Sequence, residues 1–201
     1  MQKKLLLVLA IVASALVSHA QVEKKDWLLG GTFRFNTNNS NDANGSTSGS
    51  NSNLNPELGW AVAKNSIIGF RGGFSVSNWT GFNGGKSTAT AYSAGLFWKK
   101  LFPINEKAGW YGDLSSGYSH SNNKFTDING TNKSASNAFY ASLSPGVYYK
   151  PSGKILLNAG IGGLGYTHTK ADAGTNFESK TNSFNVTLLN YFSFGVSFII
   201  S

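Results

Sequence analysis

The chain has 201 residues, which is enough for one ordinary domain or two small ones. Only 13% of the residues are charged, about half the usual quarter, and a soluble helical protein needs many more on its solvent faces. The formal charge of +8 comes from scattered lysines with no basic run, so we expect no nucleic-acid partner. The absence of cysteine excludes a disulfide scaffold, a thiolate zinc site and a cysteine nucleophile.

Residues 1–20 have the layout of a secretory signal peptide. Lys3 and Lys4 precede an apolar stretch over 5–17, which is too short for a comfortable membrane span. Small residues at Ser18 and Ala20 predict cleavage between Ala20 and Gln21. The alternative is an uncleaved N-terminal anchor. We therefore expect an exported protein with a single domain over residues 21–201.

The exported part contains eight segments in which apolar residues alternate with polar or small ones, a pattern typical of β-strands. Most segments are 9 to 12 residues long, about the length that a tilted strand needs to cross a bilayer. The segments cover residues 27–35, 54–63, 67–77, 88–99, 109–119, 138–149, 155–166 and 184–198. Turn signals near Asn65, Pro103 and Pro151 alternate with longer polar connections over 36–53, 80–86, 122–133 and 170–178. This asymmetry is typical of an eight-stranded antiparallel up-and-down barrel in an outer membrane, with short periplasmic turns and longer external loops.

The two faces of the strands differ in the size of their side chains. In the last segment, Phe184, Val186, Phe194, Val196 and Phe198 share one parity, while the opposite parity is mostly Asn, Ser, Thr and Gly. Small polar residues suit the crowded inside of a narrow barrel, so the bulky face is expected to meet lipid. The alternative is a soluble lipocalin-like barrel with the apolar face turned inward.

Aromatic residues collect near the short-turn end of the predicted barrel. They predict an interfacial girdle, although large aromatics that only fill a core are the alternative; its members are Trp27, Trp60, Trp98, Trp110 and Tyr149. Lysines near the same turns are expected to keep those turns solvated or to meet anionic headgroups; they are Lys64, Lys99, Lys100, Lys107, Lys150 and Lys154.

Four charged residues take the inward parity and predict a polar network in the lumen: Arg34, Glu57, Arg71 and Asp113. Arg34 and Glu57 flank the first long connection and are expected to pair across the hairpin. Unpaired charges in a narrow lumen carry a large desolvation cost, so we interpret the network as ion-paired. A gate or a proton path is the functional alternative to a satisfied polar core.

The signal peptide, the alternating segments and the terminal sequence Tyr191-Phe-Ser-Phe-Gly-Val-Ser-Phe-Ile-Ile-Ser201 together resemble the small outer-membrane β-barrel family. This family includes the OmpA and OmpX transmembrane domains. The resemblance implies a monomer in a bacterial outer membrane, whose partners are outer-membrane lipids and the assembly machinery, and whose external loops meet an extracellular ligand or surface. The chain departs from the family in ending on Ile200-Ser201 rather than on an aromatic residue.

An enzyme of the lipid A-modifying type needs a histidine beside a serine and an acid. His120 and His168 lie at loop-side strand ends, and His120-Ser121-Asn122 lacks the deacylase-type His-x-Ser-Asn spacing. We expect no catalytic site, no metal and no cofactor. A structural or surface-interaction role is the preferred hypothesis, and a narrow channel, a lipid-modifying enzyme and a soluble binding barrel are the alternatives.

Overall fold

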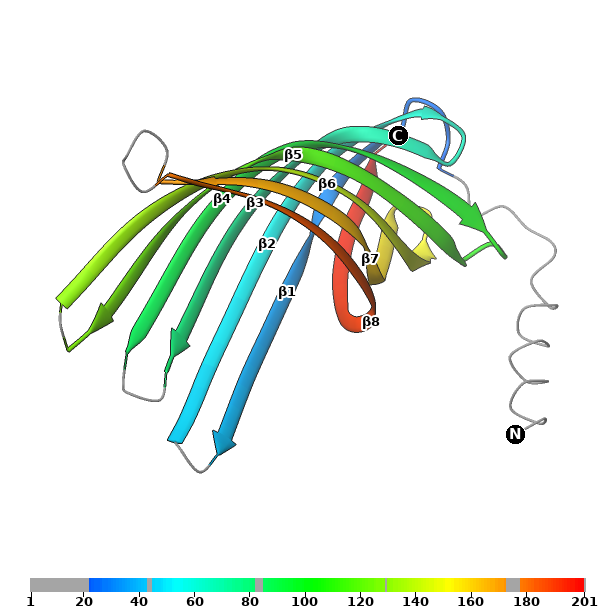
Figure 1. The fold of residues 1–201 in the computed structure, drawn as a ribbon. Coiled ribbons are helices and arrows are strands. Elements are labelled where there is room, and N and C mark those ends of the chain that lie inside the picture. Colours follow the sequence, from blue (N-terminus) through cyan, green and yellow to red (C-terminus); the bar gives the residue numbers. More distant parts are fainter. Residues whose placement is uncertain (1–21, 43–44, 82–84, 129, 173–177, 201) are drawn as a thin grey trace.

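A computed structural model describes residues 22–42, 45–81, 85–128, 130–172 and 178–200 of the chain. Over these ranges the strands follow one another in the sequence as β1 (Trp27–Asp42), β2 (Gly45–Ala63), β3 (Ser66–Thr80), β4 (Lys86–Pro103), β5 (Ala108–Asp127), β6 (Gly130–Ser152), β7 (Ile155–Ala171) and β8 (Ser179–Ile200). Each strand pairs with its neighbours in antiparallel register, and β8 returns to pair with β1, which closes the ring of strands (Figure 1). The all-β antiparallel prediction is confirmed, and every predicted segment lies inside one of these strands.

Alternation decides which side chains point out of the barrel. In β3, the bulky Ile68, Phe70 and Phe74 are exposed, while Arg71 and Ser75 belong to the opposite face and line the lumen. Successive residues of a strand point to opposite faces, so one parity forms the outside and the other the inside. The apolar side chains therefore stand outward, which is the reverse of a lipocalin-like arrangement.

The strands extend well beyond the predicted segments at one end of the barrel. The prediction of a long polar loop over 36–53 is wrong, because β1 and β2 continue as a paired ladder from Asn36↔Asn51 to Asp42↔Gly45. The predicted loop over 122–133 is wrong for the same reason, since β5 and β6 pair as far as Asp127↔Gly130. Backbone hydrogen bonds hold these hairpins, and polar residues on both faces leave no period-2 signal. These two long connections are thus extended hairpins, whereas the strands end at Thr80 and Ala171 as the predicted connections over 80–86 and 170–178 require.

The short-turn end is packed more tightly. Asn65 adopts a left-handed conformation (φ 59°) in the turn between β2 and β3, a conformation that asparagine tolerates better than most residues. Its backbone N–H donates to the carbonyl of Val22 at 2.9 Å, and its Oδ1 accepts from the Val22 N–H at 3.0 Å. The segment that precedes β1 is therefore fixed against this end of the barrel.

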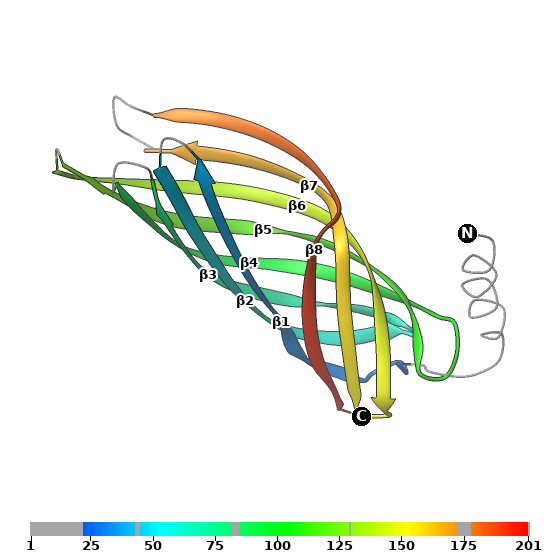
Figure 2. The same ribbon diagram turned by 90° about the horizontal axis from the view of Figure 1, so that it is seen from below.

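The seam between the first and last strands is short. β1 and β8 pair only from Trp27↔Ile200 to Phe33↔Phe194 within the described ranges. Past that point β1 pairs with β2 and β8 pairs with β7, and the far ends of β1 and β8 lie well apart in Figure 1. The view from below shows the same curved sheet with its hairpin end spread open (Figure 2). The barrel is thus closed around the short-turn end and open along one side toward the hairpins.

Candidate functional site

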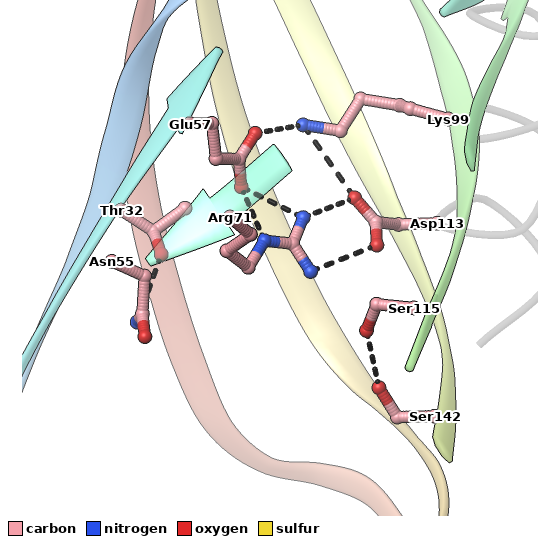
Figure 3. A network of polar contacts seen from close by, with 8 residues as sticks. All are labelled: Thr32, Asn55, Glu57, Arg71, Lys99, Asp113, Ser115 and Ser142. Carbon is pink, nitrogen blue, oxygen red and sulfur yellow. Dashed lines mark hydrogen bonds and ion pairs between the residues drawn. The ribbon is translucent and has the colours of Figure 1, made fainter. Parts of the chain in front are cut away.

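Four adjacent strands bring four charged side chains together inside the barrel (Figure 3). Glu57 on β2 lies opposite Arg71 on β3, and Lys99 on β4 lies opposite Asp113 on β5. All four take the inward parity, and their long side chains bring two acids and two bases together inside the barrel, although Arg71 lies opposite Gly95 rather than Lys99 in the β3–β4 ladder. We call these four residues the ionic cluster.

Each member of the ionic cluster contacts charges on more than one strand. The guanidinium of Arg71 donates to both oxygens of Asp113, from Nη1 at 3.1 Å and from Nη2 at 2.6 Å. Its Nε donates to Glu57 Oε1 at 2.9 Å. Lys99 Nζ lies 2.8 Å from Glu57 Oε2 and 3.5 Å from Asp113 Oδ2. The pairs therefore form one connected network, which includes a bidentate arginine–carboxylate contact.

The ionic cluster is neutral in sum and largely removed from solvent. The side chains of Glu57 and Lys99 are each 2% exposed. The ring of Phe97 lies 5.0 Å from Arg71 Cζ and 5.3 Å from Lys99 Nζ, within the range of cation–π attraction. Buried charges are tolerated when every one is paired and hydrogen-bonded. The arrangement is that of a satisfied polar core along the lumen-facing side of β2 to β5.

The structure changes two details of the sequence interpretation. Glu57 does not form its ion pairs with Arg34, because Oε1 engages Arg71 and Oε2 engages Lys99. Arg34 lies opposite Asn53 in the ladder and lines the lumen further toward the hairpins. Glu57, Arg71 and Asp113 are brought together, whereas Arg34 lies four positions nearer the hairpin than Gly30, the residue opposite Glu57, because the β1–β2 register sets its depth.

Lys99 is the member that sequence reasoning missed. It was predicted to solvate a short turn, and that prediction is wrong, because Lys99 is buried within the lumen. Lys150 is also buried rather than solvated. The missed signal was parity: Trp98 and Tyr149 point outward, so the residue that follows each of them points inward. Strand alternation therefore predicts the direction of these lysine side chains better than their nearness to a turn does.

At the level of the ionic cluster and beneath it, large apolar side chains fill the short-turn end. We call this layer the apolar floor; it comprises Val22, Leu28, Ala61, Ile67, Phe97, Leu101, Tyr111, Tyr148, Leu156 and Ile199. At this level the inward face departs from the expectation of mostly small polar residues. Bulky side chains that interdigitate at this end leave no room for water. The lumen is therefore sealed at its short-turn end.

Above the ionic cluster lies a cavity of about 510 Å³, which we call the lumen cavity. Glu57, Arg71, Lys99 and Asp113 line its lower part. Its walls carry mostly glycines and neutral polar side chains, among them Asn53, Asn55, Ser75, Ser93, Ser142 and Asn158. Several of these groups bond one another across strands, such as Ser115 to Ser142 at 2.8 Å. The lumen is thus a polar recess over a charged base.

The predicted girdle residues lie on the outside of the barrel, toward the short-turn ends of their strands. All are exposed: Trp27, Trp60, Trp98, Trp110 and Tyr149. Trp27 and Trp60 face each other in the β1–β2 ladder, with ring centroids 6.3 Å apart and an interplanar angle of 22°. Trp98 donates from Nε1 to Ser66 Oγ at 2.9 Å. Trp79 lies at the opposite end of β3.

In the described part of the chain, His120 and His168 have amide partners. His120 Nδ1 lies 2.8 Å from Asn137 Oδ1, and His168 Nδ1 lies 2.7 Å from Asn182 Oδ1. Within the described ranges, no group of three or more His, Asp or Glu side chains could hold a metal ion. Over the same ranges, none of the helices is both long and apolar enough to span a membrane. The predicted cleavage site at Ala20 and Gln21 lies outside the described residues.

Three solved structures are similar to this chain at low identity. The attachment invasion locus protein Ail of Yersinia pestis has 14% identity and a TM-score of 0.42, with 89% of this chain and 100% of that chain covered. The N-terminal β-barrel domain of Pseudomonas aeruginosa OprF has 11% identity and a TM-score of 0.41, with 89% and 100% covered. Neisserial surface protein A has 13% identity and a TM-score of 0.41, with 86% and 96% covered. No protein-family model and no curated protein sequence matches the chain.

Proposed function

We propose that the protein is an integral outer-membrane β-barrel, eight-stranded, antiparallel and up-and-down, that is exported by a signal peptide over residues 1–20. It is a non-enzymatic monomer with a structural or surface-interaction role, exercised through its extended hairpins. Its partners are outer-membrane lipids, the assembly machinery and an extracellular ligand or surface.

The observation that carries this proposal is the continuous exposure of bulky apolar side chains around the barrel. Every strand contributes some of them, for example Phe33, Leu58, Phe70, Leu96, Leu114, Phe139, Leu164 and Phe194. Such a belt is far larger than the apolar patches that soluble monomers expose. An apolar band outside and a polar lumen inside are what lipid demands of a barrel.

The channel alternative is weakened by the apolar floor. Leu28, Ile67 and Leu156 are almost fully buried at the short-turn end, and the ionic cluster lies inside the barrel on β2 to β5. A conducting pore needs a continuous water path, and ions do not cross a packed apolar layer. We therefore propose that the protein does not conduct.

The enzyme alternative lacks an acid beside either histidine. The partners of His120 and His168 are asparagine side chains, which do not stabilise an imidazolium as a carboxylate does. A serine nucleophile needs a neighbouring base that is held in position and whose protonated, charged form is stabilised. The histidines therefore support a role in the polar surface of the hairpins.

The experiment begins with membrane fractionation and with gel mobility before and after boiling. A folded barrel in the outer membrane migrates differently when it is not boiled, because its closed hydrogen bonding resists detergent. Planar-bilayer recordings are then expected to show no unitary conductance, and lipid A mass spectra are expected to be the same with and without the gene. Recovery in the soluble periplasm with equal gel mobilities would contradict the membrane proposal.

A further inference from the structure

The walls of the lumen cavity carry a chemistry that the proposed function does not use. Hydroxyl and amide side chains predominate, so the cavity offers hydrogen-bond donors and acceptors instead of the apolar lining that an acyl chain requires. A serine hydroxyl provides one donor and two acceptor positions, so even the paired Ser142 retains bonding capacity. We propose that the lumen cavity binds a carbohydrate, a hydroxyl-rich ligand held above the ionic cluster.

The size and shape of the cavity suit a ligand of a few sugar rings. Its volume of about 510 Å³ lies within the range of about 300–1,000 Å³ that small-molecule sites occupy. The apolar floor and the ionic cluster close it at one end, so a ligand has a base to rest on. The charged groups of that base already bond one another, which leaves the wall to recognise neutral hydroxyls.

Tyr140 gives the wall an aromatic surface. Gly95 and Gly117 lie opposite each other on β4 and β5, and Tyr140 follows on β6. A Cβ at Gly95 would lie 2.7 Å from the Tyr140 hydroxyl, and one at Gly117 would lie 2.6 Å from it. The two glycines thus make room for the phenol, which also lines the cavity. A tyrosine offers an apolar ring and a polar tip, which match the C–H faces and hydroxyl edges of a sugar.

The open side of the barrel between β1 and β8, called here the side opening, gives a route into the cavity besides the one through the hairpin end. Beyond Phe33↔Phe194 the β1–β8 ladder ends, and both edges contribute to the lining, Arg34 from β1 and Thr187 and Ser193 from β8. An unpaired sheet edge exposes backbone donors and acceptors, which are costly against hydrocarbon but useful to a hydroxylated ligand. The opening therefore suits a polar group rather than bare lipid tails.

Two sources could supply the same sugar chemistry. A free saccharide would enter from water through the hairpin end, whereas the head group of a glycolipid would enter sideways between β1 and β8. Phe35 and Phe184 are exposed beyond the end of the ladder, so the side opening lies within the apolar belt. The inference concerns the lumen alone and does not depend on what the hairpins bind.

Gly165 provides a variant that narrows the cavity. It lines the cavity, and a Cβ built on it meets nothing within 4 Å. Gly112 is a matched control, because its Cβ also meets nothing within 4 Å but its neighbours Tyr111 and Asp113 point inward, so it points outward. Gly165→Leu is therefore expected to crowd a ligand in the cavity, and Gly112→Leu to leave the cavity unchanged.

The test is isothermal titration of protein folded in a phosphocholine detergent, which carries no sugar. Di-N-acetylglucosamine and maltose are the free probes, and a dialkyl lipid bearing the same di-N-acetylglucosamine head group, in vesicles with reconstituted protein, is the second arm. We expect wild type and Gly112→Leu to bind equally and Gly165→Leu to bind about tenfold or more weakly. Gel mobility checks that each variant is folded.

Preference for the lipid-borne head group over the free disaccharide would identify the side opening as the route, and equal affinity would identify the hairpin end. The proposal is overturned if the folded wild type binds no probe in either arm up to about 10 mM, or if Gly165→Leu binds as tightly as wild type. A membrane-inserted, non-conducting barrel would survive either of those results, so failure here is distinct from failure of the proposed function.

Discussion

Lys99 Nζ lies 2.8 Å from Glu57 Oε2, and each of these side chains is only 2% exposed. The two residues come from β4 and β2, with β3 between them, so the contact spans an intervening strand on the inside of the barrel. Arg71 on that strand bonds the other Glu57 oxygen. One carboxylate thus ties three strands together at a single level of the barrel.

Removing Lys99 is expected to destabilise the barrel. Lys99→Met leaves Glu57 and Asp113 with Arg71 as their remaining cation in the cluster, and breaking a buried pair in this way costs about 3–5 kcal/mol. Urea unfolding in lipid vesicles measures the change. Lys100→Met is the matched control, because Lys100 donates to the backbone carbonyl of Lys64 at an exposed site. Equal effects of the two variants would contradict the burial of Lys99.

Removing both partners is expected to cost less than the two single changes together. Glu57→Gln combined with Lys99→Met leaves no uncompensated charge from that pair, so the double variant should be more stable than additivity predicts. The free energies of unfolding of the two single variants and the double variant give the coupling. Strict additivity would show that the 2.8 Å contact contributes nothing specific.

The aromatic girdle makes a prediction about depth. Trp27, Trp60, Trp98 and Trp110 are exposed near the short-turn ends of their strands, where amphipathic rings are stabilised among headgroups. Tryptophan fluorescence is therefore expected to be quenched most by lipids brominated close to the headgroup. A Trp79→Phe variant removes the tryptophan from the opposite end. Stronger quenching by bromines near the bilayer centre would contradict an interfacial position.

The extended β1–β2 hairpin is expected to protect its backbone from hydrogen exchange. Thr37↔Ser50 and Asn39↔Ser48 belong to a continuous ladder, so amides that bond across it should exchange more slowly than those of a mobile loop. Mass spectrometry of peptides from the hairpin measures the rate. The same peptides in urea-unfolded protein supply the unprotected comparison. Rates as fast as those of the unfolded protein would restore the loop interpretation.

The mature N-terminus is expected to be Gln21. Val22 is buried in the apolar floor and bonds Asn65 in both directions, so cleavage after Ala20 keeps the residue that fills this position. N-terminal sequencing of protein from the outer membrane gives the answer directly. Retention of Met1 would contradict the signal peptide, and cleavage beyond Val22 would contradict its place in the floor.

Alternation by itself determined the architecture. Because a strand turns successive side chains to opposite faces, the pattern in β3 and β8 separates a bulky outer face from a small inner one before any contact is known. The same parity put Glu57, Arg71 and Asp113 on the inward face. The same alternation places Lys99 on the inward face, although its nearness to a turn suggested a solvated side chain.

Only the tertiary structure decided which residues meet. Glu57 pairs with Arg71 and Lys99 instead of Arg34, because the stagger between strands sets the depth of each side chain and no local pattern records it. The hairpins likewise extend as ladders held by backbone bonds that every residue type can form. The end of the β1–β8 seam at Phe33 and Phe194 depends on strands at opposite ends of the chain, so their separation was invisible until the ring closed.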